Sequence, residues 1–234
     1  RFAREWDDYV ELLEEMVLAY PDEKEARYYL GLMYRARGRP DAGRRMMESV
    51  LTLDPSYSAG VNLLAYWAAD DGDEAKADSL SSRYIELEPN IANSYDSRGE
   101  ILQMFWRRED ALATYREGLD RVSGTESMLW LLNLLVNADL GADDLEGARA
   151  DLQPFLGSND PDVARWTRQM LANTYAAEGR YLDALDALRS AVVRARERGG
   201  DWVWVQAEVA FFSDMVGDYA AAEDAFGEVL RLER

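Results

Sequence analysis

The sequence contains no cysteine and no histidine. Their absence excludes disulfides, thiol nucleophiles, ordinary zinc sites and any serine–histidine dyad. Lysine is scarce, since only Lys24 and Lys76 among the 26 basic residues are lysine. No stretch reaches the roughly 18–20 apolar residues that a membrane-spanning helix needs, and the nearest candidate, 128–136, is short and contains Asn133. We therefore expect neither an enzyme nor a membrane protein.

Acidic residues outnumber basic residues by 45 to 26, which gives a net charge of −19. This charge opposes binding to nucleic-acid backbones and to anionic membrane surfaces, so we expect no nucleic-acid partner. Two interpretations remain: a surface that attracts basic partners, or a proteome adapted to high salt and a GC-rich genome, which we favour. Neither an initiator methionine nor a signal peptide is visible at Arg1. We expect a segment cut from a longer, cytoplasmic, bacterial protein.

One spacing of residues recurs along the chain. From 27 to 55 the recurring residues are Leu30, Gly31, Tyr34, Gly38, Met47, Val50 and Pro55. Pro89 follows Pro55 by 34 residues, and the segment between them repeats the layout with Leu64, Ala65, Gly72, Ala77 and Tyr84. Such a unit resembles the tetratricopeptide repeat (TPR), with its pattern W-x-x-L-G-x-x-Y, then A-x-x-x-F, then P. The resemblance implies an all-α fold, a right-handed α-solenoid superhelix of antiparallel helix pairs.

The repeat layout predicts a single array over 1–234. It comprises a half repeat at 1–23, whose first helix would precede Arg1, and repeats that begin near 24, 58, 92, 129, 165 and 203. Turn signals separate the two helices of each repeat at Gly38, Gly72, 106–110, 141–144, Gly179 and Gly217. In the second helices a small residue precedes a large one by four, in the pairs Ala111/Tyr115, Ala148/Leu152, Ala184/Leu188 and Ala222/Phe226. We also expect a longer second helix that ends at 199–200.

The sequence departs from the TPR pattern at positions that are usually apolar. No repeat has tryptophan at position 4, and polar residues occupy slots that are usually apolar, namely Arg27, Arg98, Asp139 and Arg168. The longer repeats look like those of bacterial regulatory proteins. A regulatory or sensory array of a larger signalling or transcriptional-regulator protein is therefore an alternative function.

A second stripe on the predicted first helices is the candidate binding site. Trp130, Asn133 and Asn137 are spaced i, i+3, i+7, and the core stripe lies about 200° away around the axis, so this stripe faces away from the core. The resemblance implies that first helices line a concave groove. The candidate groove residues are Tyr28, Asn62, Tyr66, Asp96, Glu100, Trp130, Asn133, Asn137, Trp166, Gln169, Asn173, Trp204 and Phe211.

Carboxamides and tryptophans in such a stripe suit an extended peptide. A carboxamide offers donors and an acceptor to a peptide backbone, and tryptophan adds rigid apolar contact. The stripe has no lysine or arginine, so the basic clamp of chaperone-binding TPR proteins has no counterpart. Asp96 and Glu100 would favour a basic peptide, although an exposed acidic pair is the simpler interpretation. The tryptophans alone are better explained by packing between first helices.

No other motif in the sequence indicates a metal-binding, phosphate-binding or catalytic site. Asp70, Asp71, Asp73 and Glu74 lack the order of a calcium loop and fall at a predicted turn. No phosphate-binding glycine motif is present, and we expect no metal, no cofactor and no catalytic residue. The leading hypothesis is a non-catalytic scaffold that binds an extended peptide or a partner helix of a protein in its concave groove. The further alternative is self-assembly, because the apolar residues Phe226, Val229, Leu230 and Leu232 of the last helix predict a possible homodimer.

Overall fold

The computed structural model describes residues 2–198 and 203–232. These residues form helices and no strand, which confirms the all-α expectation. The helices are α1 (Phe2–Ala19), α2 (Lys24–Ala36), α3 (Pro40–Leu53), α4 (Ser58–Asp70), α5 (Glu74–Leu87), α6 (Ala92–Met104), α7 (Arg108–Arg121), α8 (Thr125–Gly141), α9 (Leu145–Leu152), the 3-10 helix η1 (Gln153–Phe155), α10 (Pro161–Ala177), α11 (Tyr181–Arg198), α12 (Val203–Met215) and α13 (Tyr219–Leu232).

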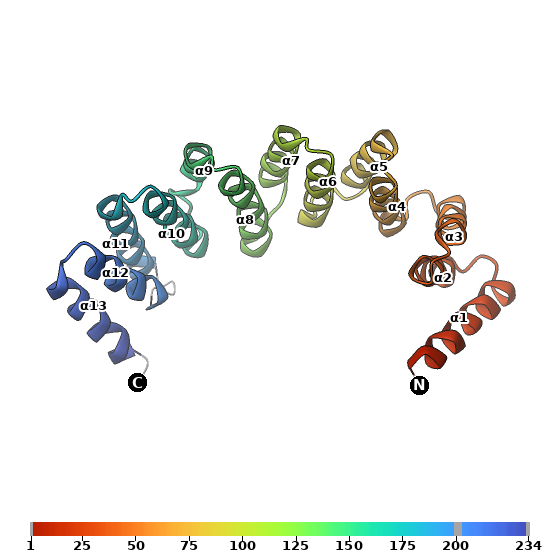
Figure 1. The fold of residues 1–234 in the computed structure, drawn as a ribbon, viewed down its shortest axis with the longest axis horizontal. Helices are drawn as coiled ribbons and strands as arrows, with labels where there is room; N and C mark the ends of the chain where they lie inside the picture. Colours follow the sequence, from red (N-terminus) through yellow and green to blue (C-terminus); the bar gives the residue numbers. More distant parts are fainter. Residues whose placement is uncertain (1, 199–202, 233–234) are drawn as a thin grey trace. The chain divides into compact units, whose positions relative to one another are not determined.

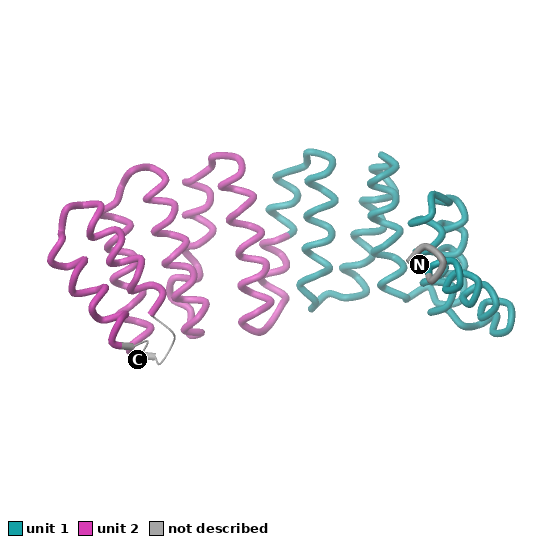
Figure 2. The backbone as a smooth tube through the Cα atoms, turned by 60° about the horizontal axis from the view of Figure 1, so that its bottom comes forward, with its two compact units in different colours: residues 1–114 teal, residues 115–234 magenta. Residues whose placement is uncertain are grey.

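The chain divides into two compact units, residues 1–114 and 115–234, which we call unit 1 and unit 2 (Figure 2). Within each unit, consecutive helices pack as antiparallel pairs, such as α2 with α3 and α10 with α11. The even-numbered helices of a unit form one layer and the odd-numbered helices the other (Figure 1). The even-numbered helices are thus the first helices of the predicted repeats.

A residue with positive φ marks every turn between the paired helices from α2 to α13. Four of these residues are glycines with φ between 70° and 81°, namely Gly38, Gly72, Gly179 and Gly217. The other two are Trp106, with φ of 61°, and Asp143, with φ of 58°. Only glycine enters this region without steric cost. The predicted stretches 106–110 and 141–144 therefore contain the same backbone turn, with Trp106 and Asp143 in place of glycine at the positive-φ position.

Helix α2 and helix α3 approach each other at a pair of glycines. A Cβ atom added to Gly43 would lie 2.7 Å from the carbonyl oxygen of Gly31. Next to this contact, Met47 and Val50 of α3 are fully buried and pack with Leu64 and Trp67 of α4. Small residues thus set the helix spacing, and large residues close the gap to the following repeat.

Position 4 of three repeats carries a polar side chain that bonds to the second helix of the same repeat. Arg27 Nη1 donates to Ser49 Oγ at 3.4 Å, and Arg168 Nε donates to Ser190 Oγ at 3.3 Å. Gln206 Nε2 donates to Glu228 Oε2 at 2.8 Å. The partner follows by 22 residues each time. Polar pairs therefore stand where the TPR pattern has an apolar tryptophan.

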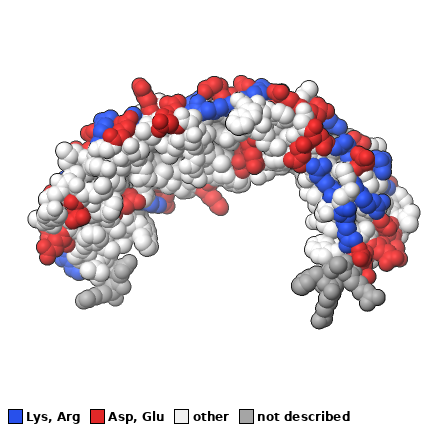
Figure 3. Space-filling model, viewed as in Figure 1, with Lys and Arg blue, Asp and Glu red and all other residues white. Residues whose placement is uncertain are grey.

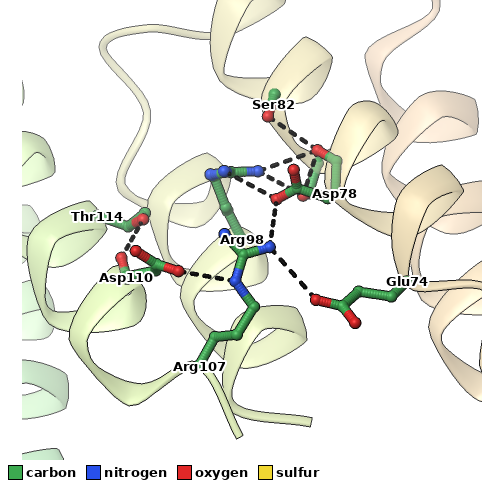
Figure 4. A network of polar contacts seen from close by, with 8 residues as sticks. Glu74, Asp78, Ser82, Arg98, Arg107, Asp110 and Thr114 are labelled. Carbon is green, nitrogen blue, oxygen red and sulfur yellow. Dashed lines mark hydrogen bonds and ion pairs between the residues drawn. The ribbon is translucent and has the colours of Figure 1, made fainter. Parts of the chain in front are cut away.

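A network of ion pairs holds α5, α6 and the start of α7 together in unit 1 (Figure 4). Arg98 pairs with Asp78 at 3.0 Å and also donates to the Asp78 carbonyl oxygen and to Ser81. Arg107 reaches Asp78 at 3.4 Å and Asp110 at 2.7 Å. The departure at Arg98 is thus accommodated by one carboxylate, a carbonyl oxygen and a hydroxyl of the neighbouring helix.

The starts of α8 and α10 differ from the predicted repeat starts. Helices α2, α4, α6 and α12 begin at 24, 58, 92 and 203, whereas α8 begins at Thr125 and α10 at Pro161, four residues before 129 and 165. At α10 the Asp160 carboxylate accepts from the backbone N–H groups of Asp162 and Val163, and Pro161 occupies the first turn. The Asp-Pro pair is a helix-start signal that the repeat count overlooked. Helix α11 extends to Arg198, and residues 199–200 lie outside the described residues.

Candidate interaction face

The outward side chains of the first helices form the candidate site, which we describe for each unit separately. The stripe of predicted groove residues on the even-numbered helices is the first-helix face. In unit 1 these residues are Tyr28, Asn62, Tyr66, Asp96 and Glu100. In unit 2 they are Trp130, Asn133, Asn137, Trp166, Gln169, Asn173, Trp204 and Phe211.

On α8 the three stripe residues are exposed together. Trp130 is 42% exposed, and Asn133 and Asn137 are exposed as well. Asn137 Nδ2 donates to Asn133 Oδ1 at 3.0 Å, so one carboxamide orients the other. Each carboxamide keeps further donor or acceptor capacity. Helix α8 thus presents an uncharged polar and aromatic surface.

On α10 the stripe is partly buried. Trp166 is half-buried and packs against the apolar cluster that contains Val136 and Leu171. This contact supports the packing interpretation for Trp166. Asn173, two turns further along, is exposed. Along the stripe on α10, Trp166 therefore contributes to the core and Asn173 to the surface.

Helix α12 carries the most exposed aromatic side chains of the stripe. Trp204 is 70% exposed and Phe211 is 55% exposed. Phe211 also meets the buried Phe212 edge to face, with ring centroids 5.5 Å apart. Trp204 is therefore available for external contact in a way that Trp166 is not.

A hydrogen bond that sequence reasoning missed joins α10 to α12. Gln169 Nε2 donates to Glu208 Oε1 at 2.5 Å. Burial raises the pKa of the Glu208 carboxyl, and the bond from Gln169 opposes that shift. Glu208 follows Trp204 by four residues, so helical spacing alone could have placed it on this face. The Gln169 carboxamide is thus hydrogen-bonded to α12, and this donor is not available to a ligand.

The unit 1 residues of the face are more involved in internal contacts. Tyr28 is half-buried against Leu64 and Trp67, and its ring meets those of Tyr29 and Tyr57 edge to face. Asn62 is partly buried.

Tyr66 and Glu100 link consecutive first helices of unit 1. Tyr66 Oη donates to Glu100 at 2.5 Å, and burial, with help from this carboxylate, raises the pKa of the Tyr66 phenol. Asp96 lies one turn before Glu100 and is partly buried. All five unit 1 face residues are therefore at least half-buried or bonded internally.

Charge is distributed unevenly over the surface. In Figure 3, lysine and arginine side chains gather over the N-terminal helices of unit 1, and large areas of unit 2 are uncharged. The stripe residues of unit 2 contain no ionisable side chain. An uncharged, partly aromatic area on a chain with a net charge of −19 is typical of a contact surface.

Clefts occur away from this stripe. A cleft of about 400 Å³ lies between α1 and α2, and one of about 570 Å³ lies among α11, α12 and α13. Among the described residues, no group of three or more acidic side chains is arranged to bind a metal ion. Over the same residues, no helix combines the length and apolarity that a membrane span requires.

Comparison with solved structures identifies the fold. No model of a protein family matches the sequence, and no curated protein matches it. The solved APC/C hetero-tetramer Cut9–Hcn1, whose Cut9 is a TPR protein, matches 97% of this chain with 18% identity and a TM-score of 0.51. This chain has the TPR fold. It spans 43% of that Cut9–Hcn1 chain.

Two further solved structures are similar to this TPR array. Pseudomonas aeruginosa PilF shares 19% identity over 89% of this chain and 91% of its own, with a TM-score of 0.48. YrrB, described as a TPR protein with an unusual peptide-binding site, shares 11% identity over 79% of this chain and 93% of its own, with a TM-score of 0.49. These similarities concern the fold alone.

Proposed function

We propose that this TPR array is a non-catalytic scaffold that binds a peptide or a partner helix of another protein through its first-helix face. The observation that carries the proposal is the exposure of Trp130, Asn133 and Asn137 on one face of α8. Exposed large aromatic side chains and exposed carboxamides with spare donors and acceptors suit a polypeptide partner. The exposed Asn173, Trp204 and Phe211 extend this surface to the following first helices.

The two units offer different chemistry to a partner. In unit 1 the face includes Asp96 and Glu100, which favours a basic stretch of the partner. In unit 2 the face has no ionisable stripe residue. A partner of the unit 1 face would therefore carry a basic stretch, and a partner of the unit 2 face an uncharged stretch.

The test is a random-peptide selection against the whole chain, followed by affinity measurements on the selected peptides. The double variant Asn137→Ala, Asn173→Ala should weaken binding about tenfold or more, because each substitution removes a hydrogen-bonding side chain from the contact. A matched control, Asn90→Ala with Asn159→Ala, removes two exposed asparagines that lie outside the stripe. Equal loss in both double variants, or no loss in either, would refute the proposal.

Self-assembly through α13 is a second candidate function. Tyr219, Phe226 and Leu230 are spaced along one side of α13 and are 69%, 47% and 61% exposed. An apolar stripe of this kind favours contact with a second copy. Light scattering over a concentration series should then detect dimers that Phe226→Glu abolishes, with Glu223→Gln as the control on the same helix. A monomer at all concentrations would eliminate this candidate.

A further inference from the structure

We propose that the cleft between α1 and α2 is a second docking site, and that its occupant is a basic amphipathic α-helix of a partner protein. The cleft has a volume of about 400 Å³ and belongs to unit 1. Most of its lining is apolar or aromatic and consists of Tyr9, Leu13, Met16, Tyr20, Ala26 and Tyr29. None of these residues belongs to the first-helix face, so the inference does not rest on the proposed function.

The cleft lies where a first helix packs elsewhere in unit 1. Helix α3 packs between α2 and α4, and α5 packs between α4 and α6, whereas the main neighbour of α1 among the described helices is α2 (Figure 1). Tyr29 of α2 corresponds to Leu63 of α4, 34 residues later, and Leu63 belongs to the same apolar cluster as Leu32 of α2. On α6 the equivalent is the buried Ser97, and α6 packs on the preceding first helix α4. Tyr29 itself is 48% exposed, so the cleft offers the place of a helix.

Tyr9 occupies a position of α1 that is small in the other second helices. It precedes Gly43 by 34 residues. In the other second helices this position is glycine or alanine and is buried, namely Gly43, Ala77, Ala111, Ala148, Ala184 and Ala222. At Gly43 the small residue permits the close approach to Gly31 of α2, whereas the Tyr9 ring lines the cleft.

A helix in this cleft therefore packs on large side chains, unlike the helix pairs within the repeats. Interfaces between proteins are enriched in tyrosine and methionine and depleted in alanine. The lining contains three tyrosines and Met16, whose flexible side chain adapts to the shape of a partner. This composition favours a separate protein over a first helix of the kind that the repeats contain.

The lining suits a helix better than an extended chain. Among the described residues that line the cleft, the polar side-chain groups are three tyrosine hydroxyls and two carboxylates. An extended chain would leave most of its backbone N–H and C=O groups without partners there. A helix bonds these groups internally and places apolar side chains at i, i+3 or i+4, and i+7 into a groove. Tyr9 and Met16 are likewise seven residues apart on α1, a rise of about 10.5 Å, so the two helices can align along the cleft.

The charge of the lining selects a basic helix. The charged side chains found in the lining are Glu23 and Glu25. Lys24 lies between them in the sequence, but its Nζ pairs with Asp54 at 2.5 Å. The bond to Glu25 raises the pKa of the Glu23 carboxyl, as expected for two acidic groups that lack a shared cation. A lysine or arginine of the partner would supply that cation, and the net charge of −19 opposes a second copy as the occupant.

The probe is a blocked peptide of about 18 residues, long enough to form a helix. Leucines at i, i+3, i+4 and i+7 form one face, and lysine, glutamine and alanine occupy the other positions. One comparison peptide has the same composition in scrambled order, and the other has glutamate in place of lysine. Calorimetry on the whole chain at physiological salt should show binding about tenfold tighter for the basic amphipathic peptide than for either comparison. Circular dichroism should show that its helix content rises on binding.

Tyrosine variants separate the cleft from a general attraction of basic peptides to an acidic chain. Tyr20→Ala and Tyr29→Ala should each weaken binding about tenfold, because each removes an aromatic ring from the contact. Both side chains are exposed, so the fold does not depend on them. Tyr219→Ala removes an exposed tyrosine of α13 and is the matched control, with an expected change of less than about twofold.

Glutamate variants test the charge of the lining. Glu23→Gln with Glu25→Gln should weaken binding about fivefold, because the partner's cation loses both carboxylates. The control, Glu86→Gln with Glu223→Gln, removes two exposed carboxylates outside the cleft and should change the affinity less than about twofold. Equal losses in the two double variants would mean that the peptide is attracted by net charge alone and would overturn the inference.

Other outcomes also overturn the inference. These are absence of binding at millimolar peptide, equal binding of the three peptides, and equal effects of the three tyrosine substitutions. Dimers in light scattering that Tyr20→Ala dissociates would identify a second copy as the occupant. Loss of peptide binding when the chain carries residues that precede Arg1 in its gene would identify its own helix as the occupant.

Discussion

The Tyr66 hydroxyl on α4 donates a hydrogen bond to the Glu100 carboxylate on α6, across 2.5 Å and a sequence separation of 34 residues. The two residues occupy successive first helices of unit 1, so the bond joins one repeat to the next. Burial is the main cause of the raised Tyr66 pKa, and the acceptor on Glu100 adds to it because the phenolate would meet a second negative charge.

Alkaline titration should detect this coupling. A phenol with a raised pKa stabilises the fold below the pKa of an unfolded tyrosine, near 10, and this stabilisation is lost as the pH rises above that value. The difference in tyrosinate absorbance between the wild type and Tyr66→Phe should therefore stay near zero at pH values where exposed tyrosines ionise. Ionisation of Tyr66 together with the exposed tyrosines would show that the bond to Glu100 does not persist. Tyr219→Phe, which removes an exposed tyrosine, supplies the control.

Replacing Trp106 by glycine should stabilise the turn between α6 and α7. Its φ of 61° costs about 1–2 kcal/mol for a residue with a Cβ atom, and the side chain is 93% exposed, so it gains little from packing. Trp106→Gly should therefore raise the free energy of unfolding by about 1 kcal/mol. Gly72→Ala, at the equivalent turn one repeat earlier, should lower it by a similar amount. Chemical denaturation of both variants checks the opposite signs, and destabilisation by Trp106→Gly would contradict the expectation.

The sequence predicted the helix pairs well because turn chemistry and apolar spacing are local. Gly38, Gly72, Gly179 and Gly217 lie at the turns where the repeat count expected them, each with positive φ. Helices α8 and α10 each begin four residues before the predicted repeat position, and the repeat period does not specify this extra turn, although Asp160 and Pro161 are a local start signal for α10.

The contacts between repeats could not be predicted from the sequence. Gln169 and Glu208 are 39 residues apart, and their bond depends on how α10 and α12 pack. The same holds for the partial burial of Trp166, which has the same pattern position as the exposed Trp204. Sequence spacing gives the side of a helix, whereas the depth of a side chain depends on the neighbouring helices. The handedness of the superhelix and the role of the face stay predictions.

The glycines at 43 and 227 should respond oppositely to alanine. Both lie within helices, where glycine to alanine normally stabilises by roughly 0.5–1 kcal/mol. At Gly227 an added Cβ meets no atom within 4 Å, so this gain should appear. At Gly43 the Cβ would lie 2.7 Å from the backbone of Gly31, so α2 and α3 must separate, at a cost of about 1–3 kcal/mol. Thermal unfolding of the two variants tests this, and stabilisation by Gly43→Ala would mean that the helices are not held at this spacing.

Asp54, the residue that follows α3, is held by a lysine and by a serine. Its carboxylate accepts from Lys24 Nζ at 2.5 Å and from the backbone N–H and hydroxyl of Ser56 at 3.0 and 2.7 Å. The bond from Lys24 is the largest cause that lowers the pKa of Asp54 to about 2. A depressed carboxyl pKa stabilises the fold above the unfolded value, near 3.9, and this stabilisation is lost as the pH falls toward the folded value.

The window for this loss therefore extends from about pH 4 down to about pH 2. Carbon NMR of the carboxyl groups should give Asp54 a midpoint near the lower end of that window. In Lys24→Met the midpoint should rise, yet stay below the ordinary value because Ser56 still donates to the carboxylate. Lys76→Met is the control, since Lys76 approaches Glu48 only to 3.9 Å and is not a partner of Asp54. An unchanged Asp54 midpoint in Lys24→Met would mean that the ion pair is not formed in solution, and that Ser56 alone holds the carboxylate at the end of α3.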